Sequence, residues 1–233
     1  MGERLEITYS YRFENKQQIT FPVHLHKDTL SLVQQSVHTP PFWAELEFSR
    51  CTVCSLDKDT ASHCPVAVNL APVVEAFRDF WSYETVEVTA TTPDRTYSKT
   101  VTIQEGLSAL LGIFMVTSGC PVMERLKPMV RFHLPFASLE ETTYRMLSMY
   151  LIAQLYHHRK GDHADWDLSG LETLYNGVGA VNASFAKRLR AAASKDANIN
   201  AMVNLDCLAK MVPYTVQDIL EEMESCFSGL LAL

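Results

Sequence analysis

The chain has 233 residues, of which 47% are hydrophobic and 20% are charged. These proportions are typical of a folded globular protein and exclude an intrinsically disordered chain. Its 20 basic and 27 acidic side chains leave a net charge of −7, which gives no general attraction for phosphate backbones or anionic lipid. We therefore expect neither nucleic acid nor a membrane surface as a partner.

The first residues lack the apolar segment that directs secretion. Residues 1–6 alternate charged and apolar side chains, and the longest apolar run, at about residues 107–116, is far shorter than the roughly 20 residues that span a bilayer. This predicts a soluble cytoplasmic protein. In a reducing compartment its six cysteines are more often metal ligands, catalytic thiols or small core residues than disulfides.

Strand patterns dominate the first part of the chain. Apolar and polar residues alternate over residues 5–13, and residues 18–26 follow as the second strand of a hairpin. Residues 85–92 and 96–103 are rich in Thr and Val and are joined by Pro93-Asp94, which predicts a second hairpin. Between the two hairpins, the sequence predicts a short strand at residues 43–48 and a helix at residues 65–81.

Two capping boxes mark the starts of helices in the second part. Thr102-x-x-Glu105 begins a helix to about residue 117 that is apolar on all sides and should be buried. Ser138-x-x-Glu141 begins a helix to about residue 160.

Helical periodicity continues to the end of the chain. Three further helices are expected at about residues 168–194, 197–212 and 216–231, separated by Lys195-Asp196 and Pro213-Tyr214. The fold class is therefore α+β. A β-rich half of antiparallel hairpins (residues 1–103) precedes a helical bundle (residues 104–233), and together they should form one integrated unit.

Four cysteines predict a metal site. Cys51-x2-Cys54 places two thiols on one turn, and Cys64 and Cys120, each followed by proline, supply two more. Four thiolates form a closed, structural zinc shell that would join the two halves of the chain. An iron–sulfur cluster takes the same ligands and is the alternative. His63 and His133 are reserve ligands if only three thiols converge.

Two other readings of the thiols remain open. All four can be unligated, or Cys51 and Cys54 can form a redox dithiol of the thioredoxin type. The dithiol reading lacks its context, because C-x2-C should follow a strand and open a helix, whereas residues 55–59 have the composition of a loop. Cys207 and Cys226 lie within apolar helical patterns, which predicts that they are core residues.

A second group of polar residues follows Cys120. It comprises Arg131, His133, Glu140, Glu141 and Arg145. Such a group can bind an anion or transfer a proton, and it can equally be a buried ion-pair network that fixes the connection at residues 134–136. We expect His133 to be partly buried and bonded to a backbone carbonyl or a carboxylate, Glu140 or Glu141 above all.

The chain resembles an uncharacterised bacterial protein family, a domain of unknown function. The segments that carry this resemblance are Cys51-Thr52-Val53-Cys54, Ser118-Gly119-Cys120-Pro121 and Arg131-Phe132-His133-Leu134-Pro135-Phe136. It implies that the thiols and residues 131–136 belong together. It implies no activity, substrate or catalytic residue.

These patterns lead to a functional hypothesis and a rival. The hypothesis is a cytoplasmic metal-binding protein with a mainly structural zinc site, which acts through contact with another protein or a small ligand. The rival is an enzyme, either a redox or iron–sulfur protein or one that uses Arg131, His133 and Glu140 or Glu141. The sequence contains no Gly-rich phosphate loop, G-x-S-x-G or H-E-x-x-H motif.

Overall fold

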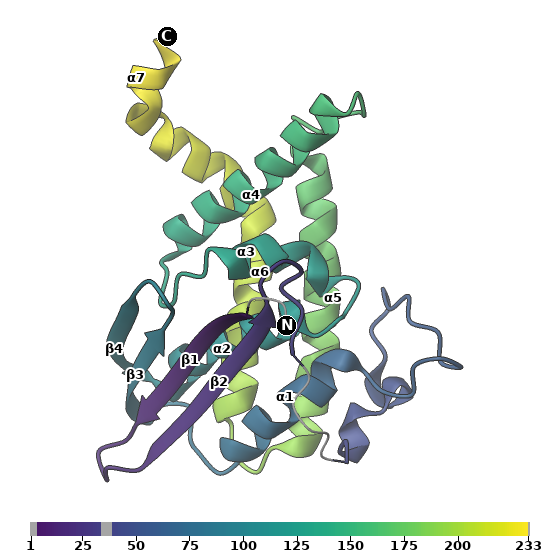
Figure 1. The fold of residues 1–233 in the computed structure, drawn as a ribbon, viewed down its shortest axis with the longest axis vertical. Coiled ribbons are helices and arrows are strands. Elements are labelled where there is room, and N and C mark those ends of the chain that lie inside the picture. The colour runs from purple at the N-terminus through teal and green to yellow at the C-terminus, as the bar shows by residue number, and fades with distance from the viewer. Residues whose placement is uncertain (1–3, 34–38, 233) are drawn as a thin grey trace.

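Two antiparallel hairpins join into one four-stranded sheet. The computed structural model describes residues 4–33 and 39–232. The strands lie in the order β2-β1-β3-β4 (Figure 1). Their bounds are β1 Arg4–Arg12, β2 Gln18–His26, β3 Thr85–Thr91 and β4 Thr96–Thr102. Both predicted hairpins are confirmed.

One face of the sheet is buried. Along β1, Ile7, Tyr9 and Tyr11 are inaccessible to solvent, and the residues between them are more exposed, which is the period of two expected of a strand with one covered face. The Tyr11 hydroxyl donates to the carbonyl of Gly106 at 3.0 Å. The buried face is therefore held against a helix by a hydrogen bond as well as by apolar packing.

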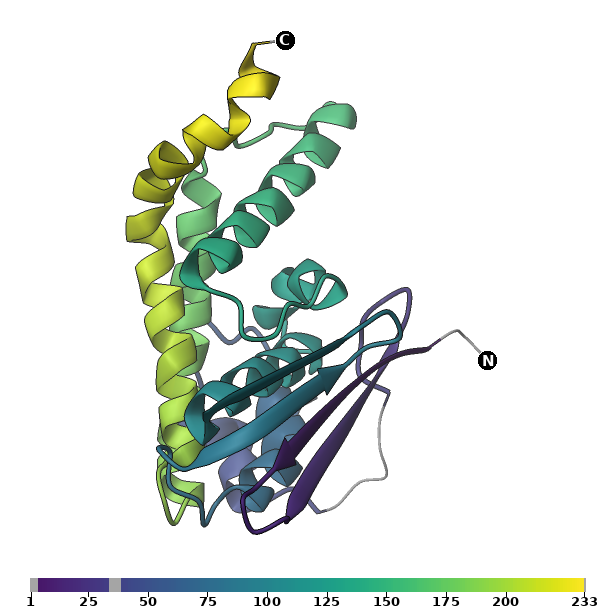
Figure 2. The ribbon, with the colours of Figure 1, turned by 90° about the vertical axis from the view of Figure 1, so that its left-hand side faces the viewer.

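Helices make up most of the second part of the chain. Their bounds are α1 Pro65–Ala76, α2 Ile103–Thr117, α3 Lys127–Arg131, α4 Leu139–Arg159, α5 Ser169–Ala192, α6 Ala197–Met223 and α7 Ser228–Leu231. Figure 2 shows α2 between the sheet and the long pair α5 and α6, with α4 crossing at an angle above. The predicted α+β class, with antiparallel strands first and helices after, is confirmed.

Two helix starts and one helix end occur where the sequence predicts them, whereas α1 ends at Ala76, before the predicted residue 81. Both capping boxes are formed, because Thr102 and Ser138 each pair with a glutamate three residues on. Gly119, just after α2, has φ of +91°, a left-handed conformation that glycine adopts without steric cost. The chain can therefore turn sharply immediately before Cys120.

Residues 43–48 do not form the predicted strand. They lie in two short 3-10 helices, η1 (Phe42–Ala44) and η2 (Leu46–Ser49). Carbonyl groups of this segment accept hydrogen bonds from the side chain of Arg188, and its only strand-like pairing among the described residues is an isolated bridge between Glu45 and His63.

Two expectations for the last helices were wrong. α6 continues past residue 213, because its buried side is shared by Ala209, Val212 and Ile219 on both sides of that position. Cys207 and Cys226 are exposed, not in the core. Periodicity placed these cysteines in helices correctly but did not show on which side of the helix they lie.

A single cluster of buried side chains includes residues from both halves of the chain, such as Val23, Val74, Leu110 and Phe185.

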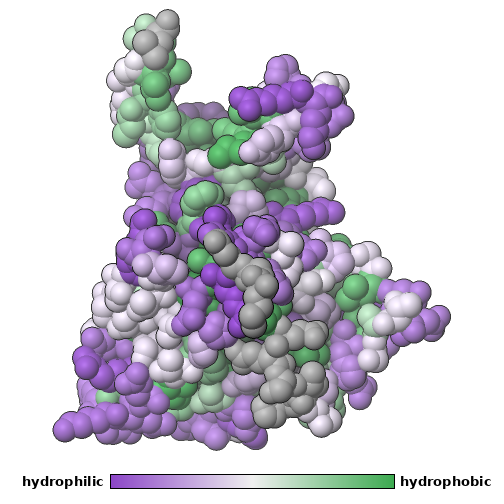
Figure 3. Space-filling model, in the orientation of Figure 1, coloured by the Kyte–Doolittle hydropathy of each residue, from purple (hydrophilic) through white to green (hydrophobic). Residues whose placement is uncertain are grey.

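Hydrophobic side chains also reach the surface at the C-terminal end, where Leu230 and Leu231 are exposed and Figure 3 shows a green patch. Within residues 4–33 and 39–232, no helix combines the length and apolarity needed to cross a bilayer.

Candidate functional site

Four cysteines come together from three separate segments. Cys51 and Cys54 lie in a turn after η2, in which the Cys54 N–H donates to the Cys51 carbonyl at 3.0 Å. Cys64 immediately precedes α1, and Cys120 follows the turn that ends α2. On α1, Asn69 donates to the carbonyl of Ser118 at 3.4 Å, which ties the start of α1 to the Cys120 loop.

The four thiols line one small cavity of about 20 Å³, which is room for about one water-sized atom. Burial, and then the neighbouring thiols Cys54, Cys120 and Cys64, raise the pKa of Cys51 to about 11. Burial also raises the pKa of Cys120, although the backbone N–H groups of Met123 and Val122 bond to its sulfur and oppose the change. Without a metal, the Cys51 and Cys120 thiols therefore stay protonated at neutral pH.

Two guanidinium groups lie beside the thiols. Arg188, from α5, is only 1% exposed and lines the cavity with Arg50. It donates to the carbonyls of Glu45, Leu46 and Ser49 at 2.7–3.1 Å and also to that of Trp43. In the described part of the chain no carboxylate pairs with Arg188. Burial lowers its pKa, and the nearby thiols Cys64, Cys51 and Cys54 act in the opposite direction.

The thiols share a cavity, but they are not arranged as the ligands of a metal ion. Among the residues that the structure describes, no group of three or more His, Cys, Asp or Glu side chains is arranged to hold a metal ion. Neither reserve ligand lines the thiol cavity. His63 bonds through Nδ1 to the Ser62 hydroxyl at 2.7 Å, and His133 lies at a different cavity.

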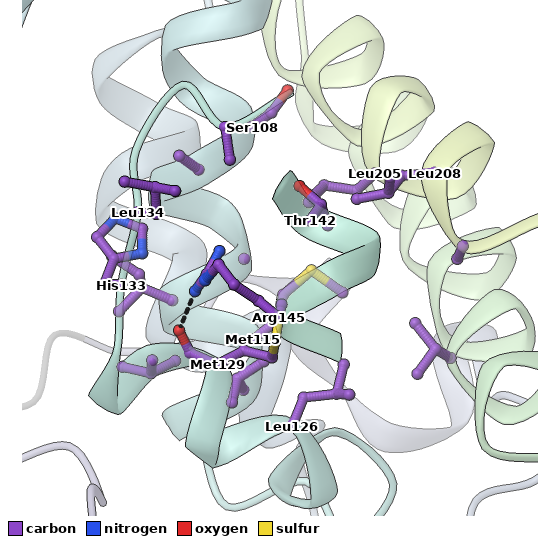
Figure 4. A pocket seen from close by; sticks show the side chains of 18 of the residues that line it. Ser108, Met115, Leu126, Met129, His133, Leu134, Thr142, Arg145, Leu205 and Leu208 are labelled. Atoms are coloured by element: carbon purple, nitrogen blue, oxygen red, sulfur yellow. Dashed lines mark hydrogen bonds between the residues drawn. The ribbon is translucent and has the colours of Figure 1, made fainter. Parts of the chain in front are cut away.

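That second cavity is much larger, about 270 Å³, is partly open to solvent, and is lined by residues of α2, α3, α4, α5 and α6. Most of its wall is aliphatic, and methionine is prominent in it. Figure 4 shows Arg145 reaching in from α4 among these apolar side chains. Arg145 donates through Nη2 to the carbonyls of Met129 and Phe132, each at 2.7 Å, while its Nε is buried without a partner.

His133 lies in the wall of this larger cavity. Its Nε2 and the Tyr9 hydroxyl are 2.6 Å apart, a hydrogen bond between the loop after α3 and the central strand β1. Burial, and then the positive charge of Arg145, lower the pKa of His133 to about 4. The imidazole is therefore neutral at physiological pH. Partial burial is as expected, but the partner is Tyr9, not a carboxylate or a backbone carbonyl.

The predicted polar group is divided by the structure. His133 and Arg145 line the same cavity, whereas Arg131 is exposed and donates to the carbonyl of Lys27 at 3.4 Å. Glu140 and Glu141 are also exposed, and Glu141 is engaged with Ser138 in the capping box. The enzyme hypothesis built on Arg131, His133 and these two glutamates thus does not find its residues in one place.

Sequence reasoning missed Arg188 and Asn182, both from α5. The signal was present, because a charged residue at position 188 shares the helical face of Val181 and Phe185. Asn182, whose Oδ1 is buried without a partner, follows Val178 by four residues and lines the larger cavity. A polar residue inside an apolar stripe marks a position where burial needs a specific reason.

Comparison with protein families identifies residues 7–228 as a domain of unknown function, DUF6901. The chain belongs to this family, and the expectation of a family of unknown function is confirmed. A search of curated proteins found no match. A search of solved structures also found none.

Proposed function

We propose that this protein is a metal-binding protein in which Cys51, Cys54, Cys64 and Cys120 hold one zinc ion. The ion would join the segment before α1 to the end of α2, and so tie the β-rich half to the helical half. Four thiolates close the coordination shell of zinc and leave no position for water or substrate, so its role is structural. The reduced thiols that this requires are those of a cytoplasmic protein.

The observation that carries the proposal is the unpaired charge of Arg188. A buried guanidinium without a carboxylate is costly, and its nearest potential anions are thiols. A zinc ion with four thiolates carries a net charge of −2. Arg188 would offset part of this charge, whereas Arg50, which also lines the cavity, is already paired with Glu47 at 3.0 Å. The same cavity is thus lined by the four thiols and by Arg188.

The raised pKa values argue against the redox alternative. A catalytic dithiol needs a thiol whose pKa is lowered, so that the reactive thiolate is present at neutral pH. The Cys51 thiol has the opposite property. Metal coordination removes this obstacle, because binding itself displaces the proton from sulfur.

Elemental analysis of the purified protein tests the proposal. We expect about one zinc per chain in the wild type, and loss of the metal in Cys51→Ser and Cys120→Ser. Cys207→Ser is the matched control, because Cys207 is an exposed thiol outside the cavity and its loss should leave the zinc content unchanged.

Two results would decide against zinc. A brown protein with visible absorption and bound iron would establish the iron–sulfur alternative, which uses the same cysteines. A reduced protein that contains no metal and takes up neither Zn²⁺ nor Co²⁺ would overturn the metal site itself.

A further inference from the structure

The larger cavity has the composition of a small-molecule site. Binding pockets are mostly apolar and carry a few polar groups that orient the ligand. Here five helices supply an aliphatic wall, and the polar groups that face the cavity are few (Figure 4). They are Glu105, Ser108, His133, Thr142, Arg145, Tyr175 and Asn182.

Its volume sets the size of an occupant. A cavity of about 150 Å³ accommodates benzene, which has six heavy atoms. At about 270 Å³, this cavity has room for roughly ten heavy atoms by the same proportion. That is the size of a medium-chain fatty acid or a phenylalkanoic acid.

Arg145 determines the charge of the occupant. Its Nε is buried and unpartnered, and no carboxylate forms an ion pair with it in the part of the chain that the structure describes. The carboxylate one turn before it, Glu141, bonds to the backbone of Ser138. A guanidinium without a counter-ion at the wall of an apolar cavity is stabilised by an incoming anion.

The other groups at the cavity allow an anion beside Arg145. His133 is bonded to Tyr9 and neutral, so it neither repels nor pairs with a carboxylate. Glu105 is the one acidic side chain in the described wall, and its carboxylate accepts from the N–H and hydroxyl of Thr102 at the start of α2. Asn182 adds a buried unpartnered oxygen that a bound water would satisfy.

We propose that this cavity binds a small apolar carboxylic acid, with the carboxylate on Arg145 and the hydrocarbon part among the aliphatic side chains of α2, α5 and α6. The site is distinct from the thiol cavity and does not depend on the metal. The ligand class and the role of Arg145 both follow from one arrangement, in which a cation that forms no ion pair within the described residues lies in a mostly apolar wall.

Calorimetric titration with three ligands of equal chain length tests the charge. Octanoate should bind wild-type protein, and octylamine should not. 1-Octanol measures the hydrophobic part alone. Arg145→Met should weaken octanoate binding by about tenfold or more and change octanol binding by less than about threefold, because only the charge-assisted hydrogen bonds are lost. Equal losses for both ligands, or no loss for octanoate, would overturn the assignment of Arg145.

A second pair of variants tests the cavity without touching Arg145. A Cβ at Gly112 would meet only Leu205, at an ordinary contact distance of 3.8 Å. Gly112→Leu should therefore fold, fill the cavity and abolish binding of both octanoate and octanol, whereas Gly112→Ala should bind both. Unchanged octanoate binding in Gly112→Leu would place the ligand elsewhere.

Nuclear magnetic resonance provides a test that does not depend on the folding of Arg145→Met. Octanoate should shift the Arg145 Nε–H resonance in the wild type and raise the pKa of His133, because a bound anion offsets the charge of Arg145. If straight-chain acids of six to twelve carbons leave both signals unchanged at millimolar concentration, the proposal is wrong.

Discussion

His133 is neutral in the folded protein, and it stays neutral at pH values low enough to protonate an exposed histidine. Its ordinary pKa of 6.5 falls to about 4, first because of burial and then because of Arg145. Between these two values the unfolded chain binds more protons than the folded one. The contribution of His133 to the free energy of unfolding should therefore be constant above about pH 6.5 and decline as the pH falls toward 4.

This gives a prediction for His133→Gln, which keeps a polar group near the Tyr9 hydroxyl but cannot titrate. Over the interval from pH 6.5 to 4 the histidine accounts for a loss of at most about 3 kcal/mol of wild-type stability. Urea unfolding at several pH values should show a smaller decline for the variant. Parallel curves for the two proteins would mean that His133 is not neutral in the folded state.

Arg188 makes a different contribution, because it is buried as a cation and bonded to four carbonyl groups. Arg188→Met leaves these carbonyls without their donor and should lower the free energy of unfolding by about 3 kcal/mol or more. Chemical denaturation measures this loss. Arg190→Met on the same helix is the control, because Arg190 is exposed and its replacement should cost at most about 0.5 kcal/mol. Similar values for the two variants would contradict the role of Arg188.

At the scale of the element, α2 is the helix that both the sheet and α6 pack against, and its two glycines meet these neighbours differently. A Cβ at Gly106 would lie 2.7 Å from Val88 Cγ2 on β3, closer than atoms can approach without movement. At Gly112 the nearest atom, on Leu205 of α6, is 3.8 Å away. The glycine at 106 is therefore required by packing, whereas the one at 112 is not.

The two alanine variants should consequently have opposite effects. Gly106→Ala should destabilise the protein by about 1–3 kcal/mol, because β-branched Val88 has little freedom to move aside. Gly112→Ala should stabilise it by about 0.5–1 kcal/mol, because alanine favours the helix interior. Thermal unfolding of the two variants checks the sign directly. Stabilisation in both would show that helix propensity outweighs the contact with β3.

The elements that sequence reasoning found are those governed by local rules. The alternation of residues 5–13 and the capping boxes at Thr102 and Ser138 depend on neighbours within a few positions, and both were correct. Residues 43–48 were assigned wrongly because their hydrogen-bond donor, Arg188, is about 140 residues away in the chain. The grouping of the four cysteines at one cavity followed from spacing, whereas the partner of His133 did not, since β1 is remote in sequence.

For the whole molecule, the proposed zinc ion is a cross-link between parts of the chain that are distant in sequence. Removing it from the wild type should lower the melting temperature by about 10 °C or more, because part of the free energy of metal binding is free energy of folding. Differential scanning calorimetry with and without a strong chelator measures the change. Cys120→Ser should melt at the lower temperature already and respond little to the chelator.

An unaltered melting curve after metal loss has been verified by elemental analysis would contradict the structural role. The Cys207→Ser variant again serves as a control and should behave as the wild type does. Together the two variants separate the effect of the ion from that of losing any one thiol.

The reach of Arg188 also has a consequence for how the protein is made. The carbonyl of Trp43 leaves the ribosome 145 residues before the guanidinium that will bind it, a delay of roughly 7–30 s at ordinary rates of synthesis. Cys51, Cys54, Cys64 and Cys120 are all synthesised within that interval, so the four thiols precede their buried cation by at least 68 residues. Metal captured before α5 is made would be held without the charge of Arg188 beside it, so loading is expected to become tight only after translation has passed α5.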